Sequence, residues 1–202
     1  FFSIVPRVAF VVLLVAHIQK KQRWCWWRAG IIVPFVYLGY CSINKIKIDN
    51  DVQDIFKQQG IAHEKYFTTP APLNNWLWFV VAGNDSGYHV GFRSLFDSKR
   101  KIDFEYFPRN KILLDSIIDH TEVQQLIRFS QDFYTVEKWS DTLVFNDLRF
   151  GQMLGWSNPR GRFVFHYFLL HPAENRMVVQ RGRFAGWNTQ VIKGLAKRIV
   201  GN

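Results

Sequence analysis

Two apolar stretches, FFSIVPRVAFVVLLVAHI at residues 1–18 and AGIIVPFVYLGYCSI at residues 29–43, decide the architecture of this chain. A helix needs about 20 mainly apolar residues to cross a bilayer, and both stretches reach that length when their aromatic flanks are counted. The sequence between them includes QKKQR at residues 19–23, which is strongly basic. Because basic loops stay on the cytoplasmic side, we expect two transmembrane helices joined by a cytoplasmic loop within residues 1–48.

The rest of the chain, residues 49–202, is expected to form one soluble domain. A chain that crosses the membrane twice around a cytoplasmic loop leaves its C-terminal part outside the cytoplasm. Trp24, Trp26 and Trp27 fit the belt of aromatic residues found where a span enters the bilayer. We therefore expect a multi-pass membrane protein with an extracytoplasmic domain and the lipid bilayer as a partner.

The start of the chain differs from that of a secreted protein. It begins Phe1-Phe2, with no initiator methionine, no charged region before the apolar run and no small-residue cleavage site. A secretory signal peptide has a charged region before its apolar run and a small-residue cleavage site after it, so this start does not fit one. We interpret residues 1–202 as a fragment of a longer protein.

The net charge of +10 is concentrated near the N-terminus. Residues 1–48 hold seven basic residues and no acidic one, which leaves residues 49–202 with a balance of only +3. A domain that binds duplex nucleic acid usually carries a concentrated basic patch, so we expect no nucleic-acid partner. Both cysteines, Cys25 and Cys41, lie at or within the second apolar stretch, so the soluble domain can form no disulfide or cysteine-based zinc site.

Hydrophobic periodicity predicts the elements of the soluble domain. Helices are expected at residues 52–59, capped by Asn50 or Asp51 after the chain leaves the membrane at residues 44–48, at residues 121–131, and after the capping residue Asn188. Strands are expected at residues 75–82, 88–96, 102–107, 134–139, 142–150, 162–170 and 177–180, and residues 68–72 form an extended connector with two prolines. Grouped strands with a few helices predict an α+β domain built on a mostly antiparallel sheet.

No catalytic constellation stands out along the chain. The six histidines lack the spacing of a helix-borne zinc site, and no nucleophile elbow or phosphate loop is present. We interpret each histidine as structural or solvent-exposed.

The clearest polar element is the pair Asp147 and Arg149, which share one face of a predicted strand. It is either a surface ion pair of under about 1 kcal/mol or a polar site presented by a rigid strand. Arg93 and Asp97 are similarly polar positions in an aromatic hairpin.

Four motifs carry a family resemblance: TTPAPLNNWLW at residues 68–78, GFRSLFD at 91–97, RFS at 128–130 and VFNDLRF at 144–150. With the FFS start and both apolar stretches, their order and spacing resemble the carboxy-terminal part of the YdjM-like membrane-bound metal-dependent hydrolases. The resemblance covers nearly the whole chain. It implies an inner-membrane protein with hydrolase activity and a divalent metal held by His and Asp residues of the preceding membrane half. No residue of this chain matches those ligand patterns, so no metal ligand and no catalytic residue is assigned here.

Two functions remain open at this stage. In the first, the chain is the last two spans and the accessory domain of a metal-dependent hydrolase, and the fragment is inactive alone. The residues expected to orient a small-molecule or lipid substrate are Trp76, Trp78, Arg93, Asp147 and Arg149. In the second, the domain is a non-enzymatic extracytoplasmic binding or scaffold domain, whose aromatic surface contacts a lipid, a glycan or a protein. A third possibility, a regulator acting through nucleic acid, requires the domain to face the cytoplasm.

Overall fold

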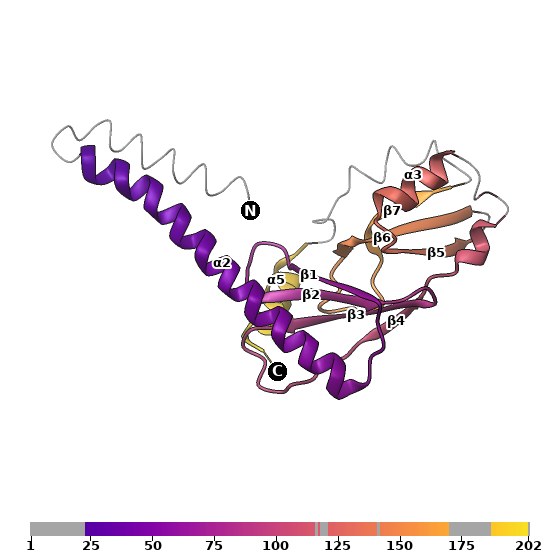
Figure 1. Cartoon of the computed structure of the whole chain (residues 1–202), viewed down its shortest axis with the longest axis horizontal. Helices are drawn as coiled ribbons and strands as arrows, with labels where there is room; N and C mark the ends of the chain where they lie inside the picture. Colours follow the sequence, from indigo (N-terminus) through magenta and orange to yellow (C-terminus); the bar gives the residue numbers. More distant parts are fainter. Residues whose placement is uncertain (1–22, 116, 118–120, 141, 170–186, 202) are drawn as a thin grey trace. The chain divides into compact units, whose positions relative to one another are not determined.

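A computed structural model describes residues 23–115, 117, 121–140, 142–169 and 187–201 (Figure 1). The chain divides into two compact units, Phe1–Asp49 and Asn50–Asn202. The first predicted span, at residues 1–18, and the predicted strand at residues 177–180 lie outside the described residues.

One helix of the described residues is long and apolar enough to cross a membrane. Helix α2 (Arg23–Gln59) includes the candidate span Gly30–Gln59, whose most apolar window is only 11% buried. Phe35 is 70% exposed and Val36 65% exposed, and the exposed apolar side chains of this helix run from Ile31 to Ile46. Beyond them, the apolar side chains from Ile48 to Phe56 are buried. The hydroxyl of Ser42 donates to the carbonyl of Leu38 at 2.9 Å, which satisfies a polar group within the helix itself.

Residues 52–59 are helical as predicted, but they continue the same helix, so the predicted helix start at Asn50 or Asp51 is wrong. Helix α2 continues to Gln59 because no proline or glycine lies between Ile43 and Gly60. The ammonium of Lys45 also pairs with the carboxylate of Asp49 at 2.8 Å, one helical turn away. The predicted stop is confirmed: Gly60 has a φ of 65°, in the left-handed region that ends helices.

The unit Asn50–Asn202 contains two antiparallel sheets rather than the single sheet expected. The first has the order β1-β2-β3-β4, with β1 (Lys65–Pro70), β2 (Leu77–Gly83), β3 (Gly87–Ser94) and β4 (Glu105–Pro108). The second has the order β5-β6-β7, with β5 (Tyr134–Trp139), β6 (Thr142–Gln152) and β7 (Phe163–Phe168). The α+β class and the antiparallel pairing are confirmed.

Strand β1 replaces part of the predicted connector at residues 68–72. Prolines there favour extended backbone, and that backbone pairs with β2 from Lys65 opposite Gly83 to Pro70 opposite Trp78. Proline lacks the N–H that an inner strand needs, so Pro70 fits the last position of a strand at the sheet edge.

The helices and short turns complete this unit. A 3₁₀ turn, η1 (Lys111–Leu114), which was not predicted, precedes α3 (Thr121–Phe129), which was. Helix α5 (Thr189–Val200) begins as expected, because the side chain of Asn188 accepts a hydrogen bond from the amide of Val191 at 2.9 Å.

The main core lies between the two sheets. It combines residues of β2 and β3 with residues of β6 and β7: Phe79, Val81, Tyr88, Val90, Leu148 and Phe163. The other face of the second sheet packs against η1 and α3 through a second cluster: Leu114, Val123, Tyr134, Val136 and Phe145. Helix α5 contributes Leu195 to a third cluster with Ala71 and Leu77.

The other face of the first sheet carries Trp78 and Arg93, which lie directly opposite each other in the β2–β3 register. The end of α2 covers this face, since Asp51 binds Arg93 at 2.6 Å and the ring of Phe56 lies 5.8 Å from that of Phe104. The absence of a side chain at Gly91 allows the segment around Ile102 to pack against β3, because a Cβ there would stand 2.6 Å from Ile102 Cγ2.

A buried ion network joins α2, β3 and α5. The Asp97 carboxylate, 4% exposed, receives two hydrogen bonds from Arg198, at 2.6 and 3.0 Å. The same carboxylate lies 3.6 Å from the guanidinium of Arg93, which binds Asp51 on α2. It also accepts the amide of Ser94 at 2.8 Å. Two arginines therefore share one buried acid.

We expect Asp97→Asn to lower the free energy of unfolding by about 3 kcal/mol, because two buried guanidinium groups lose their shared counter-charge. The matched control is Asp103→Asn, whose side chain is 85% exposed and pairs with Lys101 at 2.9 Å. Exposed pairs contribute little, so the control should change stability by less than about 1 kcal/mol. Urea unfolding of both variants in a neutral detergent tests this, and equal midpoints would contradict it.

Candidate functional site

The structure places three of the five predicted site residues at one end of the first sheet. Trp76 is 39% exposed, just before β2, whereas Trp78 is 3% exposed beside Arg93. Arg93 is 4% exposed, and its guanidinium engages Asp51 and Asp97. Of the three, only the Trp76 ring presents substantial surface to a ligand.

Asp147 and Arg149 lie on β6, the central strand of the second sheet. They form a two-pronged ion pair, with Arg149 Nε 3.1 Å from Asp147 Oδ1 and Nη2 2.7 Å from Oδ2. The carboxylate is fully buried and the guanidinium is 24% exposed, so the pair is neither an exposed nor an edge contact. Arg149 also lies 5.0 Å from the centre of the Phe129 ring, at the end of α3.

The two groups do not form one site. Trp78 and Arg93 occupy the face of the first sheet that α2 covers, and Asp147 and Arg149 contact the α3 side of the second sheet. The core between the sheets separates them. A common substrate-binding role for all five residues stays a prediction that would need a ligand contacting both sides.

Three histidines lie outside the described residues: His17, His120 and His171. His89 and His166 are half-buried on strands among aromatic rings, with His89 5.2 Å from Tyr106 and His166 5.8 Å from Trp139. Burial lowers the pKa of both. His63 differs, because it lines a cavity.

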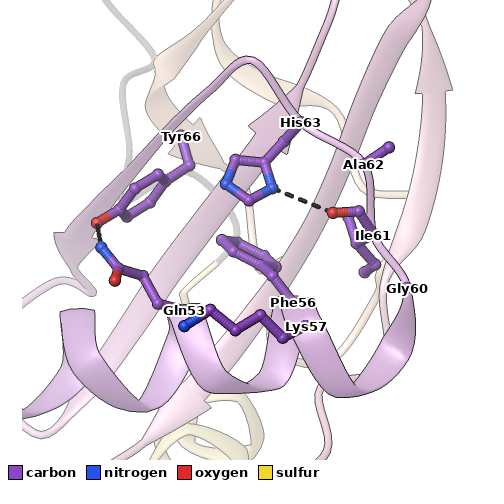
Figure 2. Close-up of a pocket in the computed structure, with 8 residues that line it drawn as sticks. All are labelled: Gln53, Phe56, Lys57, Gly60, Ile61, Ala62, His63 and Tyr66. Atoms are coloured by element: carbon purple, nitrogen blue, oxygen red, sulfur yellow. Dashed lines mark hydrogen bonds between the residues drawn. The ribbon is translucent and has the colours of Figure 1, made fainter.

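The described residues contain an open cleft where α2 ends and β1 begins, with a volume of about 390 Å³ (Figure 2). Phe56 forms its floor and is 2% exposed. The His63 ring stacks at a tilt over Phe56 with centres 4.6 Å apart, and Tyr66 meets Phe56 edge-on at 5.7 Å. The cleft is therefore lined by three aromatic rings from one continuous stretch of chain.

Polar groups stand around this floor. The amide of Gln53 donates to the hydroxyl oxygen of Tyr66 at 2.7 Å, and His63 Nδ1 lies 3.1 Å from the carbonyl of Ile61. Figure 2 shows the Lys57 side chain extended along α2 toward Gln53. The remaining lining residues are Gly60, Ile61 and Ala62. The arrangement can hold a small molecule by ring contacts and a few hydrogen bonds.

Sequence reasoning assigned residues 52–59 to a helix and interpreted His63 as structural or solvent-exposed, so it missed this cleft. A signal was present: Gln53, Phe56, Lys57 and Gly60 share one helical face, and an aromatic-rich turn follows directly. The helical face and the aromatic-rich turn form a cleft only because the chain reverses direction at Gly60, and neither pattern predicts that reversal by itself.

A second unpredicted cluster surrounds Arg109, which is 4% exposed. Its guanidinium binds Asp85 and lies 3.1 Å from an Asp132 oxygen, with the Tyr134 ring centre at 4.5 Å. The hydroxyl of Tyr88 donates to the backbone carbonyl of Asp132. Burial raises the pKa of Tyr88 to about 12, although the charge of Arg109 acts in the opposite direction. These contacts join turns from both sheets, which gives the cluster a structural role.

Within the described ranges, no three His, Cys, Asp or Glu side chains lie together so as to hold a metal ion. These residues thus offer no donor set for the divalent metal that the family resemblance implies, and no reaction step is derived through it.

Comparison of the chain with protein-family models, with curated proteins and with solved structures finds no significant match.

We expect stability to fall as the pH drops below about 6.5, partly through His89 and His166. Their folded-state pKa values lie below the ordinary value of 6.5, so the unfolded chain binds more protons in that window. The stabilisation is complete above pH 6.5 and is lost as the pH falls through the folded-state pKa. Urea midpoints at pH 7.5 and 5.5 should differ less in the His89→Gln/His166→Gln variant than in the parent. An equal drop in both proteins would contradict this.

Proposed function

We propose that this chain is a membrane-anchored accessory domain, held at the bilayer by α2 and contributing binding rather than catalysis. The observation that carries the proposal is the exposure of large apolar side chains along α2: Ile32, Val33, Phe35, Val36, Leu38 and Ile43 are all more than half exposed. Exposed apolar surface costs about 25 cal/mol per Å² in water, and a bilayer removes that cost. The helix also has the length and composition of a span.

The family resemblance supports an accessory role in a YdjM-like hydrolase of the inner membrane. The motif at residues 68–78 forms the end of β1 and the loop into β2, where Asn74 accepts the amide of Leu77 at 2.8 Å. The motif at residues 91–97 supplies Arg93 and Asp97 to the buried network. The other two motifs meet where Arg149 covers Phe129. All four motifs thus contribute contacts that hold the domain together.

In this proposal the catalytic metal belongs to the membrane half that precedes residue 1. Such a metal acts as a Lewis acid and lowers the pKa of a bound water, which suits hydrolysis of an ester or phosphoester. The present domain would anchor and orient a substrate. Of the five expected contacts, Trp76 and Arg149 keep exposed surface for one.

A second candidate, a binding domain that serves no enzyme, is favoured by the cleft at Phe56. Its aromatic floor and polar rim have the character of a small-molecule site. Both candidates share the anchored, extracytoplasmic domain.

Cysteine labelling tests the anchor and the topology. In a cysteine-free background, Cys41 is restored in one variant and Gln125→Cys, on the exposed face of α3, is introduced in another. In bacterial spheroplasts we expect a membrane-impermeant maleimide to label Gln125→Cys and to spare Cys41, because hydrocarbon excludes the reagent and the thiolate. Detergent is the control that should expose both. Fast labelling of Cys41 would contradict the anchor, and labelling of Gln125→Cys only after lysis would place the domain in the cytoplasm.

Metal content and hydrolysis of phosphoester and ester probes test the enzymatic assignment. We expect the longer protein, with its preceding membrane half, to bind a divalent metal and turn over a probe, while residues 1–202 do neither. Turnover by residues 1–202 would contradict the accessory role. Absence of metal from both proteins would favour the second candidate.

A further inference from the structure

The cleft at the end of α2 has a charge that identifies the kind of molecule it suits. None of its eight lining residues is acidic, and Lys57 places an ammonium group at the rim. Lys57 is exposed and forms no ion pair with any described residue. The cleft therefore offers a positive charge beside its aromatic rings.

The partial negative charge at the C-terminal end of α2 offsets part of the Lys57 charge but does not cancel it. A helix C-terminus carries about half a negative charge, and its effect at an exposed site is about 0.3–1 kcal/mol. Two of the terminal carbonyls are already engaged: that of Phe56 accepts the amide of Ile61 at 3.0 Å, and that of Lys57 accepts the amide of Gly60 at 3.4 Å. The full charge of Lys57 exceeds the remaining partial charge.

Tyr66 adds a hydrogen-bond donor. Its oxygen already accepts from Gln53 at 2.7 Å, so its own proton remains available to a ligand. The carbonyl of Ile61 can only accept a hydrogen bond, so His63 Nδ1 carries the hydrogen that it donates at 3.1 Å. In the neutral ring, Nε2 is then a hydrogen-bond acceptor.

The floor suits an apolar body. His63 and Tyr66 present ring surface, held in place by the buried Phe56 ring beneath them, and Ile61 and Ala62 add aliphatic surface at the rim. The volume of about 390 Å³ lies in the range of small-molecule sites, roughly 300–1,000 Å³. A ring or a short alkyl chain fits such a space.

We propose that this cleft binds a small organic anion, with its carboxylate or phosphate at Lys57 and the Tyr66 hydroxyl and its apolar body on the His63 and Tyr66 rings. The inference rests on the binding role proposed above and gives that role a ligand class. Such an acid is either a free metabolite or the head of a lipid, and both share the same chemistry at the cleft.

Titration calorimetry of residues 1–202 in a neutral maltoside detergent tests the proposal. The probes are phenyl phosphate and benzoate as free acids, dihexanoylphosphatidic acid as a lipid acid, and benzyl alcohol as the uncharged counterpart. We expect saturable binding of at least one acid, at least tenfold tighter than benzyl alcohol and weaker at high salt. The acid that binds best distinguishes the free source from the lipid source.

Variants locate the binding. Lys57→Met keeps the aliphatic stem and should weaken the acid at least tenfold, Lys57→Arg should restore most of the affinity, and Tyr66→Phe should weaken it several-fold. Lys111→Met, the same change at an exposed position on η1, is the control and should leave binding unchanged. Both lysines are exposed, so the variants are expected to fold.

Three results would overturn the proposal: no saturable binding of any acid, equal binding of benzyl alcohol, or unchanged affinity in Lys57→Met. None of them bears on the membrane anchor, which the cysteine labelling decides separately.

Discussion

The unit Asn50–Asn202 depends on one buried carboxylate. Asp97 lies in the loop after β3 and holds Arg93 from that strand and Arg198 from α5. Removing charges from water costs several kcal/mol per ion, so such a group is stable only when every partner is in place. Because Arg93 also binds Asp51, the same network positions the last turns of α2. The aromatic cleft at Phe56 lies on those turns, so its position depends on the ion network around Asp97.

Elements with strong local signals were predictable from the sequence. Strand β5 begins and ends at the expected residues, and α5 begins at the expected cap, because alternation and capping involve neighbours in the chain. Strand β1 was mistaken for a connector because prolines are weak strand formers, and only its pairing with β2 identifies it. The division into two sheets was also missed. Each strand pairs with its neighbour along the chain, and the sheets divide between β4 and β5, which alternation within single strands does not reveal.

For the candidate site, too, the sequence indicated single residues but not their distant partners. Sequence reasoning identified Arg93, Asp97, Asp147 and Arg149 as unusual polar positions. The partner of Arg149 was predictable because it lies two residues away, whereas Asp97 and Arg198 are 101 residues apart. No periodicity carries information over that distance. The cleft is different, since residues 53–66 are close in sequence, and only the reversal of the chain at Gly60 brings Phe56 under His63.

The composition of β1 has a consequence for contacts between copies of this protein. An open strand edge can pair with the edge of another molecule, and such pairing leads to aggregation. Strand β1 begins with Lys65 and ends with Pro70, so one end carries a charge and the other lacks an amide donor. A charged residue and a proline on an edge strand both disfavour pairing with another chain. The edge is thereby protected against self-association by the same proline that obscured the strand in the sequence.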